Sequence, residues 1–333
     1  MAKITVLGSG GFGLSLAVML DKYGHDVIVR SSSKQVINDI RRDGENKAKL
    51  PGVKIPESII LTDDISCITG SEVVIFGIPT KGVRSVAKLA SPYITPEMAV
   101  VNTGKGLEEG TLKRMSEVLS EEIPQADSVV LSGPSHAEEV AVGMPTTVAA
   151  ASMNMEKASF VQSVMSNEMF RIYLNDDVIG CEIGGALKNV IALCAGIVDG
   201  LGYGDNTKAA LMTRGISEIA DLGRALGARS ETFSGLTGIG DLIVTCTSMH
   251  SRNRRAGILI GKGTPPEEAV KLVGTVEGYL CTKVAYELAC RTGIKMPITE
   301  QCNNVLFNNA SVRDAVKNLM GRPKKHEIET TAF

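Results

Sequence analysis

A glycine pattern close to the N-terminus restricts the fold of this chain more than any other feature. A β-branched run at residues 4–7 leads into Gly8-Ser9-Gly10-Gly11-Phe12-Gly13, and apolar residues then recur at helical spacing up to Tyr23. In this spacing Gly8 makes a tight turn, Gly10 lets the backbone approach a pyrophosphate, and Gly13 lets the helix pack on the strand. The pattern therefore predicts a strand, a glycine turn and a helix that together bind a dinucleotide.

The length and the hydrophobic pattern predict two domains. The chain has 333 residues, which is about twice the length of a typical domain. Patterns of buried strands recur at residues 26–30, 73–80, 99–106, 128–131 and 170–174. After about residue 177 the pattern becomes helical and stays so. We expect an α/β fold with an N-terminal Rossmann dinucleotide-binding domain over residues 1–176 and an all-helical substrate and catalytic domain over residues 177–333.

Within the helical half, residues 207–226 are expected to form a buried central helix. Arg214 and Glu218 stand four residues apart in it, which predicts an ion pair on the helix surface.

The end of the second predicted strand indicates which dinucleotide binds. An NAD-specific site usually carries an acid there for the ribose hydroxyls, but this chain has Arg30-Ser31-Ser32-Ser33-Lys34. Arginine, lysine and hydroxyl groups suit a 2′-phosphate, so the sequence favours NADPH over NADH. Ser32 or Ser33 can also cap the following helix, and the two roles are compatible.

Polar loops follow the later buried strands. Ligands of an open parallel sheet sit outside the carboxyl ends of its strands, so Lys105 is expected near the nicotinamide end, although a solvated lysine is the alternative. Gly133-Pro134-Ser135 is expected to form a rigid turn whose backbone N–H groups meet a ligand. His136 could serve as a general acid or base, but we favour a structural role at a helix start.

Lys188 stands out among the helical lysines because its helical neighbours are small. Gly184, Gly185, Ala192 and Ala195 lie at i−4, i−3, i+4 and i+7 from it. Such a stripe lets other groups pack closely and remove water from the ammonium, which lowers its pKa and suits a general acid or base. A solvated helix lysine is the alternative.

Residues 234–257 combine a glycine-rich turn, a carboxylate and several side chains that can donate hydrogen bonds to an anion. Gly235, Gly238 and Gly240 precede Asp241, and Ser251-Arg252-Asn253 offers hydroxyl, guanidinium and amide groups. The segment predicts a site for a small phosphate ester beside a carboxylate. Arg254 and Arg255 are assigned to a solvated face.

Charge and cysteine content exclude several classes of function. The 35 basic and 37 acidic residues give a net charge of −2, which argues against a broad surface for nucleic acid. We expect no metal site, since the four histidines lack zinc-type spacing, and no apolar run long enough to span a membrane. Seven cysteines without a Cys-x-x-Cys pair, several of them in apolar helical patterns, predict reduced, buried thiols in a cytoplasmic protein.

Four motifs together resemble the bacterial type of NAD(P)-dependent glycerol-3-phosphate dehydrogenase. They are the glycine turn, residues 131–138 (LSGPSHAE), residues 182–189 (EIGGALKN) and residues 235–256. The resemblance implies a Rossmann domain joined to a helical domain like that of 6-phosphogluconate dehydrogenase. It implies reversible reduction of dihydroxyacetone phosphate to sn-glycerol 3-phosphate with NADPH or NADH, for phospholipid synthesis, and a homodimer.

The resemblance also implies roles for individual residues. Lys188 matches the family's proton acceptor, and Asp241 lies in the matching Gly-Asp step. Both belong to the matching substrate contacts, together with Lys105, Gly133, Ser135, Asn189, Ser251, Arg252 and Asn253. The matching dinucleotide contacts are Gly11, Phe12, Lys105, Ala137, Arg252, Thr275 and Glu277. At the adenosine end, Ser32 and Ser33 stand where relatives commonly have His or Arg, and Lys49 stands where they have tyrosine.

Two other functions fit parts of the pattern. One is an NADPH-dependent reductase of a 3-hydroxy acid or keto acid, which would bind a carboxylate in place of a phosphate. The other is a non-catalytic NADPH-binding sensor, which would not need Lys188 and Asp241 in one crevice.

Overall fold

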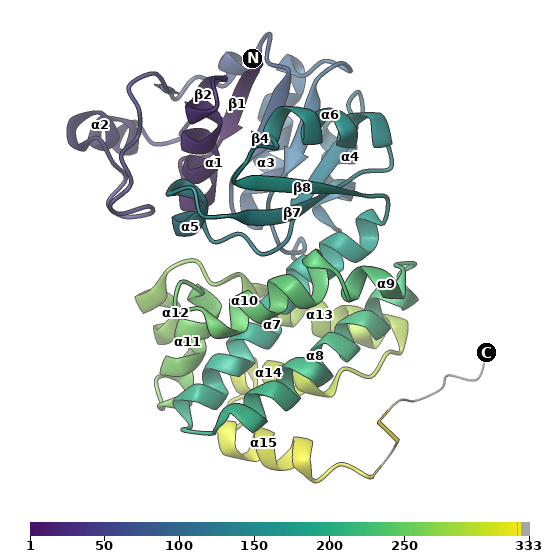
Figure 1. Cartoon of the computed structure of the whole chain (residues 1–333). Coiled ribbons are helices and arrows are strands. Elements are labelled where there is room, and N and C mark those ends of the chain that lie inside the picture. Colours follow the sequence, from purple (N-terminus) through teal and green to yellow (C-terminus); the bar gives the residue numbers. More distant parts are fainter. Residues whose placement is uncertain (325, 328–333) are drawn as a thin grey trace.

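A computed structural model describes residues 1–324, 326 and 327 (Figure 1). These residues contain an eight-stranded sheet in the order β3-β2-β1-β4-β5-β6-β7-β8. The strands are β1 (Lys3–Leu7), β2 (Asp26–Arg30), β3 (Ile60–Thr62), β4 (Val73–Phe76), β5 (Ala99–Asn102), β6 (Ser128–Ser132), β7 (Thr146–Ala151) and β8 (Phe170–Asn175). Neighbouring strands run parallel except β6 and β7, which are antiparallel.

Helices cover both faces of the sheet. Alternate residues of β4 point to opposite faces, so Val73 and Ile75 share a core with α1 and α6, whereas Val74 and Phe76 share one with α3 and α4. These helices are α1 (Gly11–Lys22), α2 (Lys34–Asp43), α3 (Val83–Ala90), α4 (Met115–Glu122), α5 (Ala137–Ala141) and α6 (Met155–Met165), with short 3₁₀ turns η1 (Ile65–Ile68), η2 (Thr80–Gly82) and η3 (Ser91–Tyr93). The predicted Rossmann-type α/β architecture is confirmed.

After Asn175 the described chain continues in helices alone, as predicted. They are α7 (Val178–Gly200), α8 (Asp205–Ala225), α9 (Ser230–Phe233), the π-helical turn η4 (Leu236–Gly240), α10 (Asp241–Thr247), α11 (Arg252–Gly261), α12 (Pro266–Val273), α13 (Glu277–Thr292), α14 (Pro297–Phe307) and α15 (Val312–Met320). In Figure 1 this helical part lies below the sheet, and α7 runs from the sheet into its middle.

The central helix of this part is α7. By length and composition it is the one helix in the described chain that could cross a membrane, but a buried core helix passes the same test. Within the protein, 94% of its most apolar stretch is buried. Its residues from Ile183 to Ile197 contribute more to the buried core of the helical part than those of any other helix.

Glycines allow α7 and α11 to cross with their backbones in contact. A Cβ atom added to Gly196 would lie 2.1 Å from the carbonyl oxygen of Arg254, and one added to Gly257 would lie 2.1 Å from that of Leu193. Gly200 and Gly261 meet in the same way one turn further along. The crossing therefore fixes where α11 begins relative to α7.

The structure corrects the expectation for α8. Only a few of its residues are buried, and it packs on the outside of α7. Glu218 is 6% exposed and does not pair with Arg214; its carboxylate accepts from the backbone N–H groups of Ile298 (2.8 Å) and Thr299 (3.3 Å) at the start of α14. The i,i+4 spacing misled because the partners of Glu218 lie about 80 residues away in the chain.

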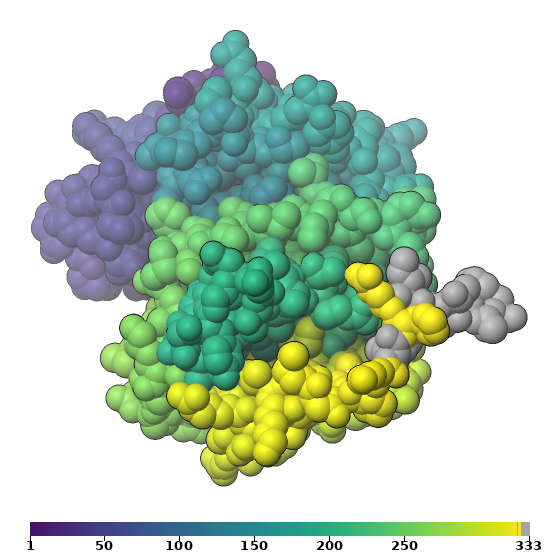
Figure 2. Space-filling view, turned by 60° about the horizontal axis from the view of Figure 1, so that its bottom comes forward, coloured from purple at the N-terminus to yellow at the C-terminus, as the bar shows by residue number. Residues whose placement is uncertain are grey.

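One buried carboxylate fastens α7 to the sheet part. Glu182 accepts from Arg114 Nη1 (2.9 Å) and from Ser116 N (2.8 Å), at the start of α4. At the opposite end of the helical part, the yellow C-terminal segment lies on the surface beside α8 (Figure 2), where Arg214 Nη1 donates to the carbonyl oxygen of Glu327 at 3.1 Å.

Candidate active site

The residues with candidate chemistry meet between the carboxyl ends of the sheet strands and the helical part. Lys105 lies in the loop after β5, and Gly133 and Ser135 lie in the turn after β6. Lys188 projects from α7, and Asp241 is the first residue of α10. The structure thus brings together side chains that lie up to 136 residues apart in the chain.

A chain of three charged groups forms the centre of this site. Asp241 is 1% exposed, and its two carboxylate oxygens have different partners. Lys188 Nζ donates to Oδ1 at 2.8 Å, and Lys105 Nζ donates to Oδ2 at 2.8 Å. Lys105 Nζ also donates to the carbonyl oxygen of Gly133 (2.7 Å) and to Ser135 Oγ (3.3 Å). Lys105 is therefore held by protein groups, and the alternative of a solvated lysine is wrong.

Burial controls the ionisation of Lys188, as its small neighbours predicted. Desolvation lowers the pKa of this lysine to about 8, assisted by the charge of Lys105 and opposed by that of Asp241. The close packing is visible at Gly184, where an added Cβ would lie 2.7 Å from the carbonyl oxygen of Thr237. Burial alone would raise the pKa of Asp241, but the charges of Lys105 and Lys188 outweigh it and hold the pKa below its usual value.

Thr245 completes the environment of the Lys188 ammonium and was missed by the sequence analysis. Lys188 Nζ donates to Thr245 Oγ1 at 2.7 Å, and that hydroxyl donates to the backbone oxygen of Asp241 at 2.6 Å. Thr245 stands one helical turn after Asp241 on α10, so the i,i+4 spacing from the carboxylate could have indicated it.

Two asparagine side chains connect three helices beside this centre. Asn189 Nδ2 donates to the backbone oxygen of Lys105 (3.0 Å), and its Oδ1 accepts from Asn253 Nδ2 (2.9 Å). Asn253 Oδ1 in turn accepts from the backbone N–H of Gly278 at 2.8 Å. Both amides are buried, so the network fixes the Lys105 loop, α11 and α13 relative to α7.

The residues predicted to bind a phosphate lie at the start of α11. Ser251 Oγ caps the helix by accepting from Arg254 N at 3.2 Å. The Arg252 side chain makes no hydrogen bond or ion pair with any other residue that the structure describes, so its guanidinium is available to a ligand. Arg255 is exposed as predicted, but Arg254 is not on a solvated face: its Nε donates to Asp199 Oδ2 at 2.7 Å and ties α11 to the end of α7.

The glycine turn has the shape that a dinucleotide requires. Gly8 has φ of +124°, and a Cβ on Gly13 would lie 2.5 Å from the carbonyl oxygen of Gly8, so both serve the strand–helix packing. An added Cβ on Gly10 would meet only the carbonyl oxygen of Gly77, at 3.7 Å, which leaves that side open. Gly10 also precedes α1 without a side-chain cap, so the N–H groups of Gly11 and Phe12 remain free to meet a pyrophosphate.

Residues assigned to the rest of the dinucleotide come from both parts of the chain. Gly11 faces the carbonyl oxygen of Lys49 and the side chain of Ala137, at 2.7 Å and 3.5 Å from an added Cβ. Glu277, from the helical part, accepts from Thr80 Oγ1 at 2.9 Å beyond the end of β4, and Thr275 lies two residues before it.

The two serines after β2 differ in their roles. Ser33 Oγ caps α2 by accepting from Val36 N at 3.3 Å, whereas Ser32 is exposed. Ser31, which is buried, accepts from Ser9 Oγ at 2.8 Å and so joins the end of β2 to the glycine turn. The helix-capping interpretation is therefore confirmed for Ser33.

His136 occupies the predicted helix-start position, as the residue before α5. Burial and the charge of Lys188 lower its pKa, and its ring centroid lies 5.7 Å from that of His250. Its Nε2 has no hydrogen-bond partner among the described residues.

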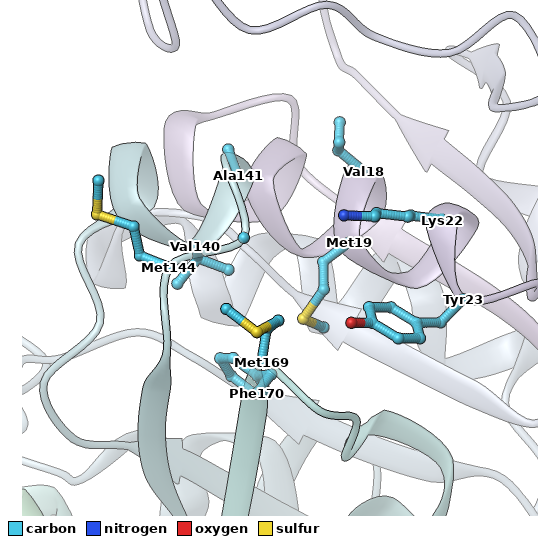
Figure 3. A pocket seen from close by; sticks show the side chains of 10 residues that line it. Val18, Met19, Lys22, Tyr23, Val140, Ala141, Met144, Met169 and Phe170 are labelled. Carbon is cyan, nitrogen blue, oxygen red and sulfur yellow. The ribbon is translucent and has the colours of Figure 1, made fainter.

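A separate small cavity lies away from these groups (Figure 3). It has a volume of about 20 Å³ and is bounded by the end of α1, by α5, by the loop before β7 and by the start of β8, with Met19, Tyr23 and Met144 among its lining residues. A volume of that size holds about one water molecule. Among the described residues, no cluster of three His, Cys, Asp or Glu side chains is placed to hold a metal ion.

Comparison with known proteins covers almost the whole chain. Residues 3–158 match the family model of the NAD-dependent glycerol-3-phosphate dehydrogenase N-terminus, and residues 177–317 match that of its C-terminus. Glycerol-3-phosphate dehydrogenase [NAD(P)+] from Desulfitobacterium hafniense is 53% identical over 100% of this chain and 95% of its own length. The enzyme of the same name from Moorella thermoacetica is 53% identical over 98% of both chains. A crystal structure of glycerol-3-phosphate dehydrogenase from Coxiella burnetii superposes with a TM-score of 0.92 at 34% identity, covering 96% of this chain and 99% of that one.

Proposed function

Because this chain belongs to the NAD-dependent glycerol-3-phosphate dehydrogenase family, we propose specific roles for its own residues in the family reaction. The chain is an oxidoreductase that interconverts dihydroxyacetone phosphate and sn-glycerol 3-phosphate with NAD(P)H. The two alternative functions, a keto-acid reductase and a non-catalytic sensor, gain no support from these relatives.

Lys188 is the proposed proton donor in the direction of reduction and the acceptor in the reverse direction. When bound, the reduced nicotinamide supplies a hydride to the ketone carbon of the substrate. The ketone oxygen then becomes an alkoxide, and Lys188 Nζ delivers its proton to that oxygen. A pKa of about 8 leaves the ammonium mostly protonated near neutral pH and still able to release a proton.

Asp241 and Thr245 position the ammonium for that transfer. Together they accept two hydrogen bonds from Lys188 Nζ, at 2.8 Å and 2.7 Å, which leaves one N–H for the substrate oxygen. Asp241 also holds Lys105 on the other side, so one buried carboxylate orients two cations toward the same crevice. We propose that Lys105, Gly133 and Ser135 contact the substrate from the sheet side.

The phosphate of the substrate is proposed to bind at the start of α11. Arg252 supplies a guanidinium that no other described residue engages, and Ser251 supplies a hydroxyl hydrogen in addition to its capping role. Asn253 has used one amide hydrogen on Asn189 and retains the second. Holding this remote dianion fixes the ketone against the proton donor, and oriented binding of that kind lowers the barrier.

The proposed dinucleotide contacts follow the glycine turn. The pyrophosphate fits the open side of Gly10 and the free N–H groups of Gly11 and Phe12. Lys49 and Ala137 lie beside Gly11, and we propose that Thr275 and Glu277 contact the dinucleotide from the helical part, where Glu277 is close enough to Arg252 for the two charges to interact. We propose NADPH as the preferred form, since β2 itself ends in Arg30 and is followed by hydroxyl groups and Lys34, which suit a 2′-phosphate.

Three further proposals concern the cellular role. The product suits the supply of glycerol phosphate for phospholipid synthesis. The seven cysteines form no disulfide, which fits a reducing compartment such as the cytoplasm. A homodimer is proposed from the family resemblance, and light scattering after size-exclusion chromatography tests it.

The buried Lys105–Asp241–Lys188 chain is the observation that carries the assignment of roles. A steady-state assay with dihydroxyacetone phosphate, following NADPH and NADH in parallel, tests the reaction and the cofactor preference. Consumption of either nucleotide that depends on the ketone supports the proposal. Absence of turnover with both nucleotides in folded protein would refute it.

A further inference from the structure

A carboxylate lies beside the end of β2, where the sequence of β2 itself lacks one. Strands β2 and β3 are parallel and adjacent, and Arg30 pairs with Thr62. The N–H of Ser31 donates to the carbonyl oxygen of Thr62 at 2.9 Å, so Asp63 follows directly at the carboxyl edge of the sheet. The neighbouring strand therefore supplies the acid that an NAD-specific site usually carries at the end of β2.

Asp63 already engages the basic residues on either side of the three serines. Arg30 Nε donates to its backbone oxygen at 3.2 Å, and Lys34 Nζ lies 3.4 Å from its Oδ2. Within the described residues, Oδ1 accepts no hydrogen bond. The side chains of Lys34 and Asp63 are 81% and 44% exposed, so a ligand can reach both. Lys34 opens α2, which projects at the left of Figure 1.

We propose that Asp63 sets the balance between NADH and NADPH in this enzyme. This inference rests on the proposed placement of the dinucleotide, in which the adenosine ribose lies at the end of β2, about 20 residues after the glycine turn. The free Oδ1 accepts a hydrogen bond from the ribose 2′-hydroxyl of NADH. The same carboxylate repels the 2′-phosphate of NADPH and competes with it for Lys34.

The two effects favour opposite cofactors, which makes them separable. Removing the carboxylate charge frees Lys34 and ends the repulsion, so binding of a 2′-phosphate strengthens. Removing it also weakens the hydrogen bond to a 2′-hydroxyl, because a neutral amide oxygen is a weaker acceptor than a carboxylate. At an exposed site in salt, a single charge changes dianion binding by about three- to tenfold.

The test measures binding of two nucleotide fragments to the whole protein. Isothermal titration calorimetry compares adenosine 2′,5′-bisphosphate with AMP for the wild type and for Asp63→Asn. We expect the variant to bind the bisphosphate about three- to tenfold more tightly and AMP about two- to fivefold more weakly. The ratio of kcat/KM for NADPH to kcat/KM for NADH should also be higher in Asp63→Asn than in the wild type.

Asp64→Asn is the matched control, since it removes the same charge one residue further along. The Asp64 carboxylate accepts from Ser66 N at 2.9 Å at the start of η1, a cap that asparagine can also provide. A fragment ratio that is unchanged in Asp63→Asn, or changed equally in Asp64→Asn, overturns the inference. If the wild type binds neither fragment, the placement of the dinucleotide fails as well, and the two failures are thereby distinguished.

Discussion

Replacing Asp241 with asparagine should shift the pH dependence of turnover that follows from the proposed role of Lys188. Lys188 Nζ lies 2.8 Å from Asp241 Oδ1, and burial already lowers the pKa of this lysine to about 8. Two unit charges at that separation attract by about 6 kcal/mol at an effective dielectric constant of roughly 20, equivalent to about four pKa units. Water entry and the hydrogen bond that asparagine still accepts offset part of this. We therefore expect the pKa of Lys188 to fall by about one to three units, to below about 7.

The direction in which activity changes with pH follows from the proposed role of the ammonium. In the proposed mechanism, reduction of the ketone needs protonated Lys188, so kcat/KM for dihydroxyacetone phosphate should be constant below the lysine pKa and fall about tenfold per pH unit above it. The wild type should lose activity above about pH 8, and Asp241→Asn should lose it from below about pH 7. Oxidation of glycerol 3-phosphate should show the mirror-image profile. Initial rates at saturating nucleotide, over roughly pH 5.5 to 9.5, measure the pH profiles of both directions.

Thr245→Val provides the matched control, because it removes a neutral hydrogen bond to Lys188 and leaves the charges in place. We expect the pH at which kcat/KM begins to fall in this variant to differ from the wild-type value by less than about one unit. If kcat/KM of Asp241→Asn begins to fall at the same pH as that of the wild type, either Lys188 is not the titrating group or Asp241 does not stabilise its charge. Either result refutes the reasoning.

The remaining predictions concern the proton donor, one helix crossing and one buried acid. Lys188→Ala should lower kcat by at least about 100-fold while the Kd for NADPH, from fluorescence titration, stays within about twofold; near-normal turnover would contradict its role. Gly257→Ala places a Cβ 2.1 Å from the carbonyl oxygen of Leu193 and should lower the free energy of unfolding by about 2 to 4 kcal/mol in urea denaturation, whereas Gly82→Ala, with 3.8 Å of clearance, should change it by less than about 1 kcal/mol. Burial raises the pKa of Glu218 to about 7 from 4.5, so the free energy of unfolding of the wild type should fall by about 3 kcal/mol as pH rises from below 4.5 through 7. Glu218→Gln should remove that dependence. If urea unfolding gives parallel pH profiles for the two proteins, the prediction is wrong.

Sequence reasoning selected the residues at the centre of the candidate site because each carries a local signal. Lys188 is marked by small residues at helical spacing, and Asp241 by the glycine turn before it. Their partners carry no such signal. Lys105 and Asp241 lie 136 residues apart, and nothing in either neighbourhood indicates that one carboxylate serves both lysines. Pairing across the two halves of the chain depends on how they dock, which hydrophobic periodicity does not encode.

The missed features of the fold have similar causes. Strand β7 reads Thr-Thr-Val-Ala-Ala-Ala, and alanine has low strand propensity, so its burial in the sheet was not evident. The crossing of α7 and α11 rests on Gly196 and Gly257, which look like helix-weakening residues when each helix is considered alone. Arg254 was assigned to solvent because its partner, Asp199, ends a different helix.

The charges at the centre explain why the site is built from both halves of the chain. Lys105 and Lys188 bring two positive charges to one buried carboxylate, so the group carries a net positive charge when both lysines are protonated. An uncompensated buried charge is costly, and neither half of the chain alone would hold it in place. In the proposed mechanism this cost falls when negative charge develops on the substrate oxygen beside Lys188. The arrangement would then favour the alkoxide over the neutral ketone, and a difference of that kind lowers the barrier to reaction.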